Sequence, residues 1–163
     1  MQEIYHYEVV TPDEGRPLTL GVYEEDLVRM GEQIFNESPI DPWADSYKPS
    51  FGDLSAVVVA LNSRKEVVGF GSLIVEDKEA ELDASFVRAE DRGMGIYKEM
   101  TRLREEIARE MGASKLRVVT MLSSLQAPFL LRTGFCLIEG EDNIYEKDLV
   151  QREGFEPSKV YTS

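Results

Sequence analysis

The strongest constraint on the fold is a change of hydrophobic pattern part-way along the chain. The segment EAELDASFV (79–87) alternates between apolar and polar residues, which is typical of a half-buried strand. From residue 94 to residue 111, apolar residues recur at three- and four-residue intervals, which predicts an amphipathic helix. Gly93 and Gly95 stand where this helix begins, although a glycine lowers helix stability by roughly 1 kcal/mol relative to alanine. The sequence therefore predicts a strand, a glycine-containing loop and a helix in direct succession.

The start of this helix is a candidate anion site. The N–H groups of a first helical turn have no internal partner, and the helix dipole adds partial positive charge there. Glycine at positions 93 and 95 leaves the backbone open to an anion, and Arg88 and Arg92 add positive charge. The spacing fits neither the dinucleotide fingerprint, because Lys98 replaces its third glycine, nor the nucleotide P-loop. A glycine turn at a tight corner between strand and helix is the alternative interpretation.

The rest of the chain reads as an alternation of strands and helices. Strands are expected at 3–10, 55–62, 66–76, 79–87, 115–121, 135–139 and 143–150, and helices at 24–36, 94–111 and 124–133. This order predicts a mixed α/β fold in which the strands from 55 to 87 form an antiparallel meander. Residues 1–150 are expected to form a single domain, followed by a polar C-terminal tail at 151–163.

Composition excludes several classes of site. The 163 residues contain one cysteine, Cys136, and one histidine, His6, so an internal disulfide and Cys/His metal clusters are excluded and no metal is expected. Cys136 lies on an apolar strand and is expected to be packed. No run approaches the ~18 apolar residues of a membrane span, and the first residues lack a signal-peptide pattern. These features predict a cytoplasmic protein without membrane contact.

The negative charge is concentrated in the first third of the chain. The net charge is −13, and residues 1–53 hold 12 acidic residues against 3 basic ones. Such a surface repels phosphates and attracts cations, so direct nucleic-acid binding is not expected. A solvated surface without a partner is the alternative explanation for the same charge.

These motifs resemble those of the GNAT superfamily of N-acetyltransferases. That family carries the signature Gln/Arg-x-x-Gly-x-Gly/Ala after its fourth strand, and residues 92–97 (RGMGIY) match it at Arg92 and Gly95. VVGFGSL (67–73) resembles the third strand of the family, and LLRTGF (130–135) resembles its Leu-Tyr-x-Lys-x-Gly-Phe segment. The resemblance spans about residues 55–149.

The resemblance implies a fold, a cofactor and a set of binding residues. The implied fold is a central mixed, mostly antiparallel sheet with splayed fourth and fifth strands, flanked by helices. The implied cosubstrate is acetyl-CoA, with its pantetheine arm along the fourth strand and its pyrophosphate at the helix start. The coenzyme-binding residues carried over are Phe86, Val87, Arg92, Gly93, Met94, Gly95, Ile96, Tyr97 and Ser123.

Three residues depart from the family pattern. Tyr97 replaces a small residue of the signature, and Ser123 stands where an asparagine often contacts the coenzyme. Leu130 stands where many members have the tyrosine that protonates the departing thiolate. The hydroxyls of Tyr145, Ser123 and Ser124 are alternative proton donors, and the sequence does not choose among them.

The expected fourth strand carries the candidate general bases. Its alternation places Ala80, Leu82, Ala84 and Phe86 on one face, and Glu81, Asp83 and Ser85 on the other. Glu81 lies eleven positions before Arg92, the spacing of the catalytic glutamate in the histone-acetyltransferase branch of the family. Glu81 and, second, Asp83 are therefore the candidate bases, and their proximity should raise the pKa of one of them. Binding of a cationic acceptor, or a solvated strand face, would explain the same two acids.

The function that follows is transfer of an acetyl group from acetyl-CoA to an amine of a cationic small molecule or protein. Two alternatives stay open: a CoA-binding module without catalysis, and an acidic interaction protein that mimics nucleic acid. A homodimer is a further open assignment.

Overall fold

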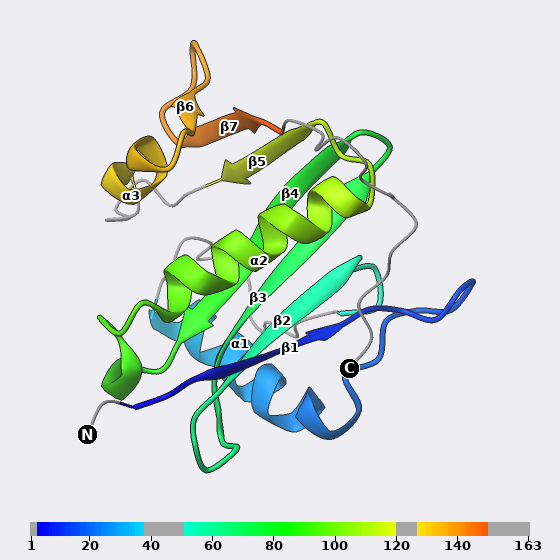
Figure 1. Cartoon of the computed structure of the whole chain (residues 1–163), viewed down its shortest axis with the longest axis vertical. Helices are drawn as coiled ribbons and strands as arrows, with labels where there is room; N and C mark the ends of the chain where they lie inside the picture. The colour runs from blue at the N-terminus through cyan, green and yellow to red at the C-terminus, as the bar shows by residue number, and fades with distance from the viewer. Residues whose placement is uncertain (1–2, 38–50, 120–126, 150–163) are drawn as a thin grey trace.

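The fold is a seven-stranded sheet with helices on both faces (Figure 1). The computed structural model describes residues 3–37, 51–119 and 127–149. The strand order is β1-β2-β3-β4-β5-β7-β6, and every neighbouring pair is antiparallel except the parallel pair β4–β5. The strands are β1 (His6–Val10), β2 (Ala56–Leu61), β3 (Val67–Glu76), β4 (Glu79–Val87), β5 (Lys115–Val119), β6 (Cys136–Leu137) and β7 (Ile144–Asp148).

Two long helices cover opposite faces of the sheet. The helices are α1 (Glu24–Glu37), α2 (Ile96–Glu110), α3 (Ala127–Arg132) and the 3-10 turns η1 (Gly21–Tyr23) and η2 (Ala89–Asp91). In Figure 1, α2 crosses in front of β2, β3 and β4, and α1 lies behind the sheet. Each helix buries its own core: Met100 and Ile107 of α2 pack on one face, and Leu27 and Met30 of α1 pack on the other. The mixed α/β fold and its mostly antiparallel sheet are confirmed.

The start of α2 follows the predicted pattern closely. The helix begins at Ile96, directly after the two glycines, and the chain turns out of it at Gly112, whose φ is +90°. The meander of β2, β3 and β4 is antiparallel as predicted. None of the helices that the structure describes is both long and apolar enough to cross a membrane.

A β-bulge in β4 changes which residues share a face. Leu73 pairs with Leu82 and Gly71 pairs with Ser85, so Asp83 and Ala84 together lie opposite Ser72. The extra residue reverses the alternation beyond Leu82.

The reversal separates residues that the alternation had grouped together. Ala80 and Leu82 pack in the core under α2, whereas Ala84 and Phe86 pack in the core under α1. The prediction that these four residues share one face is therefore wrong, because a strict period of two cannot cross a bulge.

The strands β4 and β5 separate at the same point. Their parallel pairing runs from Glu79 and Lys115 to Leu82 and Val118 and ends there, although β4 continues to Val87. Figure 1 shows the two strands side by side at one end and diverging towards α3. The predicted splay of the fourth and fifth strands is thus present, and it begins at the bulge.

Cys136 does not have the expected packing. It lies exposed on β6, a two-residue strand at the edge of the sheet that pairs only with β7 among the described strands. An edge strand this short has no sheet neighbour on its outer side, so an apolar sequence there does not ensure burial.

Candidate active site

The loop between β4 and α2 leaves the helix N-terminus open. Gly93 and Gly95 have φ angles of +80° and +84°, a region that residues with a side chain rarely adopt. A Cβ atom added to either glycine would meet no atom within 4 Å. The first hydrogen bond into the helix runs from Glu99 N–H to Gly95 O, at 3.1 Å. The amides that precede Glu99 in the first turn are thus directed outwards, into open space.

Arg92 closes this loop onto the end of β4. Its Nε donates a hydrogen bond of 2.8 Å to the carbonyl of Val87, and its guanidinium lies over the Phe86 ring, 5.7 Å from the centroid. The side chain is exposed, and Arg92 directly precedes Gly93 in the chain. Arg92 therefore both fixes the loop and keeps positive charge at the helix start.

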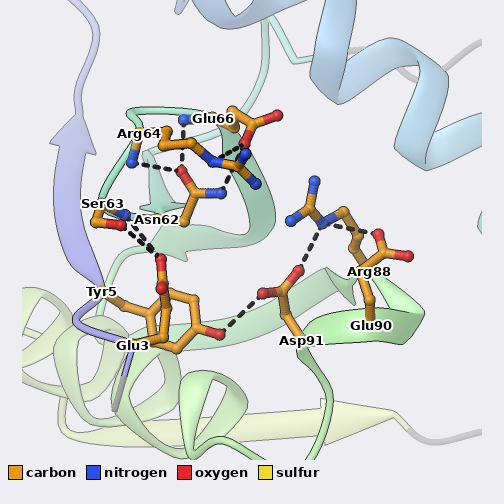
Figure 2. Close-up of polar contacts among 9 residues, drawn as sticks. All are labelled: Glu3, Tyr5, Asn62, Ser63, Arg64, Glu66, Arg88, Glu90 and Asp91. Atoms are coloured by element: carbon orange, nitrogen blue, oxygen red, sulfur yellow. Dashed lines mark hydrogen bonds and ion pairs between the residues drawn. The ribbon is translucent and has the colours of Figure 1, made fainter. Parts of the chain in front are cut away.

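Arg88 is engaged elsewhere. Its Nε donates to Asp91 Oδ2 at 2.5 Å and lies 2.8 Å from Glu90 Oε1, as Figure 2 shows. Asp91 is buried, and its other oxygen accepts a hydrogen bond of 2.8 Å from the Tyr5 hydroxyl. Burial and this hydrogen bond raise the pKa of Tyr5 to about 12. Arg88 therefore neutralises the acids of the loop and does not supply the free positive charge that the sequence predicted.

The same network ties the loop to the N-terminal segment. Glu3 Oε1 accepts hydrogen bonds from the backbone amide and the hydroxyl of Ser63, in the turn between β2 and β3. Asn62 closes that turn, because its side-chain oxygen accepts from the amides of Arg64 and Glu66 (Figure 2). Tyr5 is thus held on a fixed support, next to the segment that leads into α2.

Backbone groups of β4 beyond the bulge face the divergence from β5. Arg88 N–H donates to Val68 O on β3, at 2.8 Å. Because backbone groups in an antiparallel strand alternate between its two neighbours, those of Phe86 also point towards β3. The groups of Ser85 and Val87 then point away from β3, towards the side where β5 has separated. Ser85 was not identified from the sequence, although it lies two residues before Val87 and its backbone groups therefore face the same side.

Tyr97 lies between α2 and α3. Its ring packs edge-on against Phe129, with centroids 5.3 Å apart, and burial raises the pKa of its hydroxyl. Leu130, next to Phe129, is fully buried. The bulky residue of the signature thus occupies space beside α3 instead of filling the glycine loop.

Glu81 and Asp83 lie on the α1 face, close to the last paired residues of β4 and β5. Glu81 is half-buried and sits between Ile74 on β3 and Arg117 on β5. Burial raises the pKa of the Glu81 carboxyl, the charge of Asp83 raises it further, and Arg117 opposes the shift. The direction agrees with the expected rise in pKa for one of the two acids, with burial as the largest cause and the charge of Asp83 as the second.

A cavity of about 190 Å³ opens beside Glu81. Four carboxylates and two basic side chains line it, together with Ile74 and Ala80; the charged residues are Glu76, Glu79, Glu81, Glu146, Lys115 and Arg117. Arg117 donates to Glu146 Oε1 at 2.8 Å, and no ion pair joins it to Glu81 within the described part of the chain. The cavity is therefore acidic overall.

Several residues singled out from the sequence lie elsewhere. Ser123 and Ser124 fall outside the described residues. Tyr145 is 7% exposed and packs in the core under α2.

One residue, Arg104 of α2, was not identified from the sequence. Its side chain is fully buried between α2 and the sheet. Arg104 lies four residues after Met100 and three before Ile107, a spacing that places it on the apolar face of the helix. That spacing was the available signal, and the charge of the residue concealed it.

The profile of the acetyltransferase (GNAT) family matches residues 25–135, more than half of the chain. The protein belongs to the GNAT family. It is an acetyltransferase domain with the glycine loop of the family at the start of α2. No curated protein sequence matches significantly.

Solved structures of other GNAT-family proteins share the fold. A GNAT acetyltransferase from Staphylococcus aureus Mu50 has a TM-score of 0.66 at 16% identity, over 89% of this chain and 100% of that one. The PaiA N-acetyltransferase of Thermoplasma acidophilum, solved with coenzyme A, has a TM-score of 0.63 at 17% identity, over 88% and 99%. Tetrahymena GCN5 has a TM-score of 0.65 at 13% identity, over 90% and 98%.

The described residues contain no group of three or more His, Cys, Asp or Glu side chains arranged to hold a metal ion. The polar groups at the end of β4 are backbone amides and Arg92, and carboxylates line the cavity near its beginning, beside Glu81. These groups are suited to anion binding and proton transfer.

The network around Asp91 predicts a distinct stability pattern. Asp91→Asn weakens the part-buried pair with Arg88 and should lower the free energy of unfolding by about 2 kcal/mol. Tyr5→Phe removes one hydrogen bond and should cost about 1 kcal/mol. Glu90→Gln changes an exposed pair and should cost less than about 1 kcal/mol. Urea unfolding followed by circular dichroism measures all three, and an Asp91→Asn variant as stable as Glu90→Gln would contradict the role given to Asp91.

Proposed function

We propose that this GNAT-family protein transfers the acetyl group of acetyl-CoA to an amine of a cationic acceptor. The observation that carries the proposal is the open helix start behind Arg92, where two glycines with positive φ expose the backbone amides of the first turn. Backbone amides and the helix dipole suit the pyrophosphate of the coenzyme.

The pantetheine arm would follow the free side of β4. The backbone groups of Ser85 and Val87 point to the side where β5 has diverged. The carbonyl of Val87 is already an acceptor for Arg92, so the groups that remain are the amide of Val87 and both groups of Ser85. Phe86, which the family resemblance included, would contribute its ring under Arg92 instead of its backbone.

Glu81 is the proposed general base. An ammonium group must lose a proton before its nitrogen attacks, and a carboxyl with a raised pKa is better matched to that step near neutral pH. The nitrogen then bonds to the thioester carbon, the negative charge collects on the carbonyl oxygen, and the carbon–sulfur bond breaks. Glu81 takes the ammonium proton before the attack. As the intermediate collapses, the nitrogen loses its second proton, and the departing thiolate takes up that proton directly or through water or a hydroxyl. Asp83 is the second candidate for the base.

The charge of the cavity supports a cationic acceptor. It lies on the α1 face beside Glu81, and its four carboxylates outnumber Lys115 and Arg117. An amine arriving from this face would meet the thioester from the side opposite to α2. Small molecules and protein side chains are both compatible with this charge.

Leu130 favours one alternative, a domain that binds CoA without turnover. The side chain is fully buried, so the position of the usual acidic tyrosine offers no hydroxyl. Mass spectrometry of amines incubated with acetyl-CoA separates the two functions, because only an enzyme produces acetylated amine.

The coenzyme site predicts the effect of a charged side chain in the loop. Gly95→Glu should reduce acetyl-CoA binding below detection in calorimetry, because the carboxylate would occupy the pyrophosphate position and repel it. Gly140→Glu is the matched control, since Gly140 has a φ of +85° and equally open surroundings. The control should bind normally. Equal affinity in both variants would place the coenzyme elsewhere.

The base assignment predicts a pH-dependent defect. Glu81→Gln should leave coenzyme affinity unchanged and lower turnover at pH 7 by about 100-fold, the usual contribution of general-base catalysis. The defect should shrink towards pH 9 or so, because the amine then loses its proton to solvent.

Asp83→Asn is the control for this experiment. It removes the neighbouring charge that raises the pKa of Glu81, so the rise of turnover with pH should move to lower pH. Near-normal turnover of Glu81→Gln at pH 7 would transfer the role of base to Asp83 or to water.

The acceptor assignment predicts a dependence on salt. Raising the ionic strength from about 0.05 to 0.5 M should raise KM for a cationic amine several-fold, because salt screens its attraction to the cavity. The KM for an amine that is neutral at the same pH should not change, and Glu79→Gln should raise KM for the cationic amine alone. A preference for an anionic acceptor would refute this assignment.

A further inference from the structure

Arg104 is an unusual component of the core. Its side chain is fully buried between α2 and the sheet, and burial lowers its pKa to about 10. No carboxylate of the described segments forms an ion pair with it. A buried charge without a counterion costs free energy. The polar contacts of Arg104 therefore point to a specific role for this residue and not to a general contribution to stability.

The sheet is shaped to receive this guanidinium. A Cβ atom on Gly71 of β3 would lie 2.8 Å from both Cζ and Nε of Arg104, which is closer than real contacts allow. Glycine at this position therefore makes room for the guanidinium flat against the strand. The missing side chain of Gly71 on β3 thus leaves the space that the guanidinium of Arg104 on α2 occupies.

One hydrogen bond of Arg104 reaches the bulge, and two longer ones stay within α2. Nη1 donates to the carbonyl of Ser72 at 3.1 Å, and weaker contacts of 3.4 Å reach Met100 O and Thr101 Oγ1. Within the stretch of β3 that pairs with β4 (69–76), Ser72 is the residue without a partner in the register. Arg104 thus satisfies a backbone carbonyl at the bulge.

The side chain of Ser72 holds the other half of the bulge. Ala84 N–H donates to Ser72 Oγ at 2.9 Å, and the same oxygen lies 3.2 Å from Asp83 Oδ2 and from Ala84 O. A continuous chain of contacts therefore runs from Arg104 through Ser72 to Asp83 and Ala84. These are the first two residues of β4 beyond its pairing with β5.

We propose that Arg104 is a positioning residue that, through Ser72, fixes the bulge and so directs the backbone of Ser85 and Val87 towards the coenzyme's pantetheine arm. The inference rests on the proposed function, because it concerns the same coenzyme. In this proposal the glycine loop binds the diphosphate of the coenzyme. Arg104, which lies outside that loop, aligns the pantetheine arm.

Two probes distinguish alignment of the arm from binding of the diphosphate. CoA contains both parts, whereas its 3′-phosphorylated adenosine diphosphate portion lacks the arm. Arg104→Met keeps the length of the side chain and removes the donors. It should weaken CoA binding about tenfold, the effect of one or two misplaced hydrogen bonds, and leave the affinity for the nucleotide portion unchanged in calorimetry. Its melting temperature should stay equal or rise, because a buried charge is removed.

Two further variants complete the test. Ser72→Ala removes the hydroxyl that accepts from Ala84 N–H. It should also weaken binding of CoA and leave binding of the nucleotide portion unchanged. If Arg104→Met does not fold, Ser72→Ala alone tests the proposal. Arg102→Met is the control on α2, since Arg102 is exposed and pairs with Glu99 and Glu106. It should bind both probes normally.

Three results would overturn the inference: unchanged CoA affinity in Arg104→Met, an equal loss for both probes, or normal CoA binding in Ser72→Ala. Failure of the unmodified protein to bind CoA would instead overturn the proposed function itself.

Discussion

The site depends on one irregularity, the bulge that places Asp83 and Ala84 of β4 opposite Ser72 of β3. The bulge reverses the side-chain alternation, and β4 leaves β5 directly after Leu82. The same two residues therefore decide which side chains reach the α1 core and which backbone groups face the divergence. A regular strand would keep its ladder partners on both sides and offer no free backbone to a ligand.

The charges around the loop resolve an apparent conflict. An acidic protein holds Glu90 and Asp91 directly before the helix start that is expected to bind an anion. Arg88 and Tyr5 occupy Asp91, and Arg88 also pairs with Glu90, so these acids are held within their own network. Positive potential at the loop then comes from backbone amides, the helix dipole and Arg92. The acidic cavity beside Glu81 lies on the α1 face.

Local patterns account for what the sequence predicted well. Helix α2, the meander of β2 to β4 and the glycine loop follow from periodicity and from the backbone freedom of glycine, which are properties of neighbouring residues. The face of Phe86 was predicted wrongly because a bulge depends on a partner strand. The role of Arg88 was also missed, because charge by itself does not show which of several acids a side chain will contact.

The sequence by itself determined the order of the elements, the open backbone before α2 and the family to which the domain belongs. Tertiary structure alone decided where β4 parts from β5, why Arg104 is buried over Gly71, and how Ser72 joins that arginine to the bulge. The physical reason is the distance along the sequence between the residues that interact. Helix and strand periodicity is written in residues a few positions apart, whereas a bulge and a buried cation are stable only when partners from distant segments satisfy their polar groups.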